Sequence, residues 1–381
     1  MAIVTVADHA TALPGIDAHP HARAVLAPAL PPLGEPSHAY LFHGPSGTGK
    51  RAIARAFAAA LLAEGAHDPA QVAGRIARGS HPDLTWVTPS GASEMLVSDI
   101  EEPVVAAATR TPFESSRRVF VIEGVDRMND QAANRMLKTL EEPPPFVHLV
   151  LLTDRREDVL QTIASRCQQV RFDPLAPARI AEGLLPGAEP ERARACAGLA
   201  LGDADLAARL ASEEGGALRR GAEELVRSAL TGETAGRPWM GLLDAARAAG
   251  TAAGEEAQER MAGELELLPS KERKRYEREG AEARRRGERR ARTQTLDLAL
   301  KLGELWLRDM VCICEGAPEL IYAVDRRSEL EEDVRGVEGD GGHVRAGIEL
   351  VEETRLSLQV NVSEELALEA MAYRLKALLA R

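Results

Sequence analysis

Apolar residues gather in five short runs over the first 173 residues of the chain, each about the length of one buried strand. The runs are AYLF from Ala39, LTWV from Leu84, RVFVI from Arg118, HLVLL from His148 and QQVRF from Gln168. Residues 51–63 and 130–142, which lie between runs, carry their apolar residues at helical spacing instead. Continuous apolar runs are typical of strands that helices cover on both faces. The pattern predicts an α/β domain with a five-stranded parallel sheet over residues 1–174.

The pattern changes after Asp173-Pro174, because proline cannot continue a strand ladder. Residues 175–231 are rich in Ala and Leu and are interrupted by LPGAEPE, which predicts a small domain of short helices. Residues 232–381 show long helical patterns and end in an amphipathic helix after NVSEE. We therefore expect two helical domains after the α/β domain. The apolar positions of the last helix would pack in an internal core or against another subunit: Leu368, Met371, Leu375 and Leu378.

The formal net charge of the 381 residues is −12, so the surface as a whole is not expected to attract nucleic acid. Residues 271–292 are an exception, with eleven Lys or Arg and five Glu. They belong to a predicted charged helical arm at about 255–292. Glu and Arg alternate there at helical neighbour spacing, which favours a solvated arm over a DNA-binding element, although the second reading stays open.

The composition indicates a soluble, cytoplasmic protein with at least one large core, since 45% of its residues are hydrophobic. The first residues lack the pattern of a signal peptide, and no apolar stretch is long enough to cross a bilayer. The four cysteines are too few and too irregularly spaced for a disulfide framework. Cys312 and Cys314 have apolar neighbours and no accompanying Cys or His pair, so we expect no zinc site.

The stretch HGPSGTGKR from His43 lies between the first predicted strand and a predicted helix. Glycines in such a loop let backbone N–H groups and the positive helix end face a phosphate, and a lysine neutralises its charge. Gly44, Gly47, Gly49 and Lys50 supply these parts, and the sequence predicts a phosphate-binding loop. Arg51 stands where a hydroxyl normally holds Mg²⁺. Arginine offers no acceptor, so we expect metal-assisted phosphoryl transfer to be impaired.

The second half of a nucleotide site is expected after the third strand, where one acidic residue holds the metal and the next activates water. The chain has Glu123 there, followed by Gly124, so the water-activating base is missing. Asp126 could replace it, but we favour a role in the following turn. Thr153 ends the fourth strand, where a polar residue could sense the γ-phosphate or simply close the strand.

Ser165-Arg166-Cys167 directly precedes the fifth strand, and this triplet resembles the SRC motif of bacterial sliding-clamp loader subunits, which are AAA+ proteins. The motifs are short, but their order and spacing support the resemblance over nearly the whole chain. The other similar stretches are SHAYLFHGPSGTGK, GSHPDL, AANRMLKTLEEPPPFVHLVLLT and LQVNVSEELALEAMAYRL.

The family includes an ATP-hydrolysing motor, gamma/tau, and a stationary subunit that largely lost hydrolysis. The motor keeps the loop hydroxyl, an Asp-Glu pair and an arginine in its second domain, whereas this chain has Arg51, Glu123-Gly124 and Asp205. The resemblance therefore implies the stationary subunit, and a gamma/tau-like motor is the alternative. A second alternative is a nucleotide-sensing or DNA-binding module that acts outside replication. Family members commonly carry a four-cysteine zinc module, but residues 63–80 contain no cysteine, so His81 is interpreted as a turn residue.

The resemblance also implies an AAA+ P-loop domain, a helical lid domain and an all-α collar domain within the DNA polymerase III complex. Arg166 would act in trans on the ATP of a neighbouring subunit. The implied partners are gamma/tau and delta, with the sliding clamp and primed DNA reached through the complex. No cofactor is required by this reading, and weak ATP or ADP binding at the degenerate loop stays open.

Overall fold

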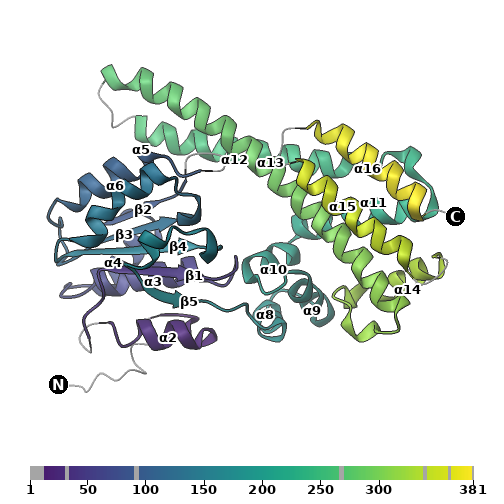
Figure 1. Cartoon of the computed structure of the whole chain (residues 1–381), viewed down its shortest axis with the longest axis horizontal. Helices are drawn as coiled ribbons and strands as arrows, with labels where there is room; N and C mark the ends of the chain where they lie inside the picture. The colour runs from purple at the N-terminus through teal and green to yellow at the C-terminus, as the bar shows by residue number, and fades with distance from the viewer. Residues whose placement is uncertain are drawn as a thin grey trace. The chain divides into compact units, whose positions relative to one another are not determined.

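The computed structural model describes residues 13–30, 34–89, 94–265, 270–337, 341–358 and 362–379. Two compact units make up the chain (Figure 1). Unit 1 comprises residues 1–175 together with 202–205, and unit 2 comprises residues 176–201 and 206–381. The division into three domains, with a second boundary near residue 231, stays a prediction.

Unit 1 is built on a five-stranded parallel sheet in the order β2-β3-β4-β1-β5 (Figure 1). The predicted α/β fold with five parallel strands is therefore confirmed. Non-consecutive neighbours in this order require crossover connections, which the helices supply. The strands are β1 (Ala39–His43), β2 (Leu84–Val87), β3 (Arg118–Glu123), β4 (Val147–Thr153) and β5 (Gln168–Arg171).

Side chains alternate between the two faces of the sheet along each strand. Apolar residues on both faces pack against helices, so helices cover both faces. Tyr40 and Phe42 of β1 pack in one core cluster with Phe57, whereas Leu41 packs in the other with Met136. All five side chains are buried. The helices of unit 1 are α2 (Pro20–Leu26), α3 (Lys50–Leu62), α4 (Pro69–Ala77), α5 (Val97–Ile100), α6 (Asp130–Glu141) and α7 (Gln161–Ala164), with a π-helical turn at Glu101–Ala106 and 3₁₀ turns at Ile16–Ala18, Val125–Arg127 and Arg156–Asp158.

Unit 2 is helical in its described part, and its largest core surrounds Trp239 and Trp306. Leu368, Met371 and Leu375 are buried in this core and Leu378 packs against it, so these positions serve the unit's own interior. The helices are α8 (Pro177–Leu184), α9 (Pro190–Leu199), α10 (Ala204–Ala211), whose first residues belong to unit 1, α11 (Glu213–Thr231), α12 (Met240–Leu265), α13 (Ser270–Cys314), α14 (Arg327–Arg335), α15 (Gly342–Leu358) and α16 (Glu364–Leu379), with 3₁₀ turns at Thr234–Gly236, Pro318–Leu320 and Val324–Arg326.

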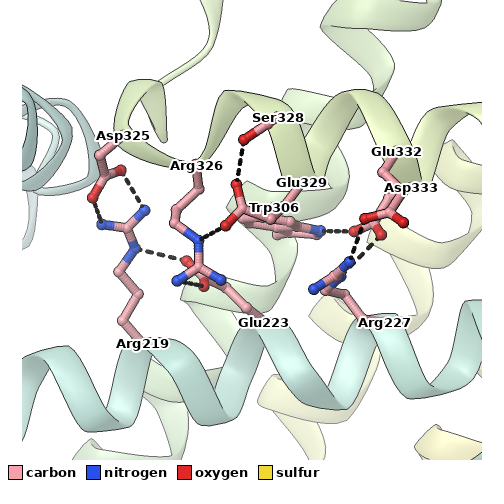
Figure 2. A network of polar contacts seen from close by, with 10 residues as sticks. All are labelled: Arg219, Glu223, Arg227, Trp306, Asp325, Arg326, Ser328, Glu329, Glu332 and Asp333. Atoms are coloured by element: carbon pink, nitrogen blue, oxygen red, sulfur yellow. Dashed lines mark hydrogen bonds and ion pairs between the residues drawn. The ribbon is translucent and has the colours of Figure 1, made fainter.

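A network of charged side chains joins α11 to α14 and to the 3₁₀ turn before it (Figure 2). Arg219 donates two hydrogen bonds to Asp325, at 2.8 and 2.9 Å, and one to Glu223 at 2.7 Å. Farther along α11, Arg227 donates to Asp333, whose other oxygen accepts from the Trp306 indole at 3.0 Å. Polar contacts therefore fix this helix pair beside the apolar core.

Candidate functional site

The glycine loop lies between β1 and α3, and its glycines adopt conformations that other residues avoid. Gly44 has φ 145° and Gly49 has φ 83°. A Cβ on Gly44 would lie 2.0 Å from the carbonyl oxygen of Phe172, so this position has no room for a side chain. The loop ends at the start of α3, and the N-terminus of a helix favours an anion.

Lys50 is buried within the loop, and its ammonium group is surrounded by acceptors. It lies 2.6 Å from the carbonyl oxygens of both Gly44 and Pro45. It also lies 2.9 Å from Asp154 Oδ1 and 3.5 Å from the Thr48 hydroxyl. An ammonium group has three N–H donors. The loop's own oxygens and Asp154 therefore satisfy the charge that would otherwise neutralise a phosphate.

Asp203 belongs to the short segment 202–205 of unit 1 and lies against the glycine loop. An ideal Cβ on Gly47 would lie 1.7 Å from Asp203 Oδ1, so the carboxylate lies directly against the Gly47 backbone. The neighbouring Ala204 N–H donates to the Gly47 carbonyl at 3.0 Å. A negative charge is thereby held beside a loop whose conformation suits anions, and it opposes a bound phosphate.

Arg51 and Glu123 form an ion pair with each other. The second oxygen of Glu123 accepts a hydrogen bond from the Trp86 indole at 2.7 Å, and Arg55 lies over the Trp86 ring at 5.0 Å. Arg51, which stands in place of the metal-binding hydroxyl, and Glu123, the acid at the metal-binding position, thus neutralise each other. A metal ion at this position would have to break the pair.

Thr153 and Asp126 contact each other at the ends of β4 and the 3₁₀ turn after β3. The Thr153 hydroxyl donates to Asp126 Oδ1 at 2.8 Å, and Arg155 donates to the other carboxylate oxygen at 3.3 Å. Asp126 is therefore held by two side chains. This arrangement agrees with a turn role for Asp126 rather than with a base facing water.

Arg166 lies in the turn between α7 and β5, with about a third of its side chain exposed. Its Nη2 lies 2.5 Å from Glu141 Oε1, and its Nη1 donates to the Thr162 carbonyl at 2.9 Å. The adjacent Cys167 is buried in the sheet core, where loss of solvent raises the pKa of its thiol to about 12. Cys167 anchors the turn that carries Arg166, and it stays a neutral thiol.

His43, the last residue of β1, precedes the glycine loop. Burial lowers the pKa of its imidazole, and Arg156 nearby lowers it further. His43 is therefore neutral at pH 7. Asp205 lies exposed in the first turn of α10. Within the described residues, no group of three or more His, Cys, Asp and Glu side chains is arranged to hold a metal ion.

The charged arm is helical, formed by the end of α12 and the start of α13. Gly250 and Gly254 of α12 face Arg292 and Glu288 of α13 at distances that leave no room for a Cβ. An open groove of about 900 Å³ follows this contact and is lined by both arginines and glutamates. The side chains of residues 271–277, 279 and 283 lie outside the described part. The DNA-binding reading of the arm stays a prediction.

Three residues at this site escaped the sequence analysis: Asp203, Asp154 and Glu141. Asp203 is far from the loop in sequence, and no local pattern connects it to Gly47. The pairing of Arg51 with Glu123 did leave a signal. An arginine and an acid stand at two positions that a nucleotide site brings together.

Comparison with known proteins gives partial matches. Residues 31–176 match the model of a family described as DNA polymerase III, delta subunit. The DNA polymerase III subunit delta' of Bacillus subtilis is 38% identical over 155 residues, which are 39% of this chain and 46% of that protein. Delta' of Pseudomonas aeruginosa is 38% identical over 138 residues, 35% of this chain and 42% of that protein.

The subunit tau of Bacillus subtilis DNA polymerase III is 37% identical over 146 residues, 36% of this chain and 24% of that protein. The chain thus spans less than half the length of each of these three relatives. Among the described residues, no helix is both long and apolar enough to span a membrane.

Proposed function

We propose that the protein is a delta prime-type subunit of a sliding-clamp loader, and the match of residues 31–176 to the model of the DNA polymerase III delta subunit family supports this proposal. In this role it belongs to the DNA polymerase III complex and hydrolyses little or no ATP itself. Its partners are gamma/tau and delta, and it acts in the cytoplasm on a clamp and primed DNA through the complex. Residues 232–381 supply the helical collar that joins the subunits.

One observation carries the proposal: the two cations at the glycine loop already have acidic partners within the chain. Lys50 contacts loop carbonyls and Asp154, and Arg51 pairs with Glu123. Hydrolysis needs a lysine on the phosphates and a metal held by a hydroxyl and an acid. The metal ligands are replaced or engaged, which supports a subunit that retained the fold without the reaction.

The second part of the proposal is that Arg166 acts in trans on a neighbouring gamma/tau ATP site. A guanidinium group is planar, always charged and suited to phosphate oxygens, and it stabilises charge that develops during phosphoryl transfer. Arg166 is partly exposed and lies outside the glycine loop of its own chain. Both features support a role for Arg166 at the ATP site of another subunit.

The test of this role is ATP turnover in the complex reconstituted with gamma/tau and delta. Arg166→Ala should assemble normally, because one exposed guanidinium contributes little to a large interface. Turnover at the adjoining site should fall steeply, since such arginines contribute on the order of 10³–10⁵ in rate. Arg166→Lys should not restore it. Arg171→Ala is the matched control, because Arg171 lies nearby on β5 and pairs with Asp173 at 3.1 Å.

The alternative is a gamma/tau-like motor, which the match to tau favours. It predicts ATP turnover by the purified chain that Lys50→Ala abolishes. Our proposal predicts that the parent chain and Lys50→Ala both release phosphate only at background level. It also predicts that Lys50→Ala leaves the activity of the reconstituted loader largely unchanged. Turnover that depends on Lys50 in the isolated chain would refute the non-hydrolysing role.

A further inference from the structure

The last residue of α6 meets the turn before β5 at Arg166. Glu141 ends the twelve-residue helix α6, and its Oε1 lies 2.5 Å from Arg166 Nη2. The opposite nitrogen, Nη1, donates to the Thr162 carbonyl at 2.9 Å. The guanidinium group is thus held at both terminal nitrogens, by one side-chain carboxylate and by one fixed backbone oxygen, and the Ser165 hydroxyl lies 3.5 Å from Nη1.

Two points of attachment determine the orientation of a planar group. A guanidinium carries five N–H donors in a rigid plane. Glu141 and Thr162 engage one donor on each terminal nitrogen, and the remaining N–H groups stay in the same fixed plane. An arginine without such support samples many rotamers, and ordering it costs conformational entropy.

Glu141 is itself positioned by regular structure. It lies on the last turn of α6, whose Ala132, Met136 and Leu140 are buried against the sheet. Thr162 belongs to α7, which is anchored by the buried Ile163. The two acceptors that hold Arg166 therefore come from packed helices, and sites supported in this way are held more precisely than sites on loops.

We propose that Glu141 is a positioning residue for Arg166, and that it fixes the guanidinium plane so that the remaining donors meet the neighbouring subunit's phosphates. This inference rests on the proposed trans role of Arg166. Glu141 does not touch the nucleotide in this scheme. It acts through Arg166, and it keeps its contact while Arg166 engages the phosphates with its other N–H groups.

The size of the effect is bounded by the exposure of the pair. About half of the Glu141 side chain and a third of that of Arg166 are accessible to solvent. An exposed ion pair changes a conformational population by at most about fivefold. Loss of Glu141 should therefore reduce turnover by up to about fivefold, far less than loss of Arg166.

The experiment compares Glu141→Gln with Glu142→Gln. Glu142 is the next residue, is exposed and follows the end of α6, so it controls for loss of one negative charge at the same place. The first measurement uses nitrogen NMR of arginine side chains in the isolated full-length chain. Rotation and proton exchange of the Arg166 guanidinium should become faster in Glu141→Gln and stay unchanged in Glu142→Gln.

The second measurement is ATP turnover in the reconstituted complex, as a double-mutant cycle with Arg166→Ala. Glu141→Gln should lower turnover up to about fivefold in the parent protein and have no further effect beside Arg166→Ala. Unchanged or increased turnover in Glu141→Gln, with Arg166→Ala still impaired, overturns the positioning role and leaves the proposed function standing. If Arg166→Ala itself has no effect, the trans role fails, and the positioning role fails with it.

Discussion

Two regions of the molecule concentrate charge, and they satisfy it differently. At the glycine loop of unit 1, Arg51 is 72% exposed while its partner Glu123 is nearly buried. In the α11–α14 network of unit 2, both Arg219 and Glu223 are less than a tenth exposed. The Arg51–Glu123 pair keeps its cation at the surface, whereas the Arg219–Glu223 pair keeps both of its charges away from water.

The difference in burial indicates which charged side chains can exchange their ion-pair partner for water or a ligand. A buried charge must keep its partner, because its desolvation has no other compensation. Arg219 accordingly uses Nε and both terminal nitrogens on Glu223 and Asp325. At the loop, water can solvate Arg51, although its partner Glu123 is nearly buried. We therefore assign a structural role to the network, while the loop retains charges that a ligand could still redirect.

The largest effect is expected from breaking the network. Arg219→Met leaves Glu223 and Asp325 without their main cation, and removal of one partner from a buried pair costs about 3–5 kcal/mol. Urea unfolding, followed by the fluorescence of Trp239 and Trp306, measures the loss in unit 2. Arg237→Met is the control, because Arg237 and Glu365 form an exposed pair at 2.7 Å. The control should lose at most about 1 kcal/mol. Equal losses in the two variants would contradict the distinction between the regions.

The fold of unit 1 was largely predictable, because its signals are local. Apolar runs mark strands such as Ala39–His43 and Val147–Thr153, and helical spacing marks the segments between them. The glycine loop was found for the same reason. Its residues are consecutive, and both the conformation and the helix that follows depend on neighbours in sequence.

The contacts that decide the state of the site were not predictable in this way. The approach of Asp203 to Gly47 depends on how the chain returns to the sheet after α9, and Glu141 reaches Arg166 only because α6 and α7 pack on the same face. Neither contact has a periodicity or a motif. Sequence reasoning identified the lost hydroxyl at Arg51 and the lost base after Glu123 separately, and missed that Arg51 and Glu123 form an ion pair.

Acid should destabilise unit 1 more than unit 2. His148 is buried in β4 beside Arg117 and His38, and burial, the largest cause, lowers the pKa of its imidazole to about 4. Its neutral form fits the site, with Nδ1 3.0 Å from the Ser37 carbonyl and Nε2 2.9 Å from Arg117 Nη1. Because an unfolded histidine has a pKa near 6.5, unit 1 gains this stability above about pH 6.5 and loses it as the pH falls toward 4.

The loss at pH 4 should reach about 3 kcal/mol for this one group. Burial raises the pKa values of Glu223 and Asp333 in unit 2. A raised carboxyl pKa favours the folded state as protons bind, so these two groups do not add acid sensitivity. Trp86 fluorescence should therefore report unfolding at a higher pH than Trp239 and Trp306. His148→Gln should remove much of this difference, and His67→Gln, at an exposed position, should not.

The smallest effect is expected from Asp203, and its removal tests whether the glycine loop can still bind a phosphate. Its carboxylate lies against Gly47, where a bound phosphate would meet it. Two like charges about 4 Å apart repel by about 1 kcal/mol in water, which corresponds to roughly a fivefold change in affinity. Asp203→Asn keeps the size of the side chain, removes the charge and replaces one acceptor oxygen with an NH₂ donor. It should bind ADP about fivefold more tightly than the parent chain in calorimetry without Mg²⁺, and the gain should shrink as salt is added. Asp205→Asn removes the same charge from an exposed position on α10 and should change the affinity little. Equal gains in the two variants would mean that only net charge matters, and no gain in Asp203→Asn would mean that Lys50, held by its own loop, already closes the site to phosphate.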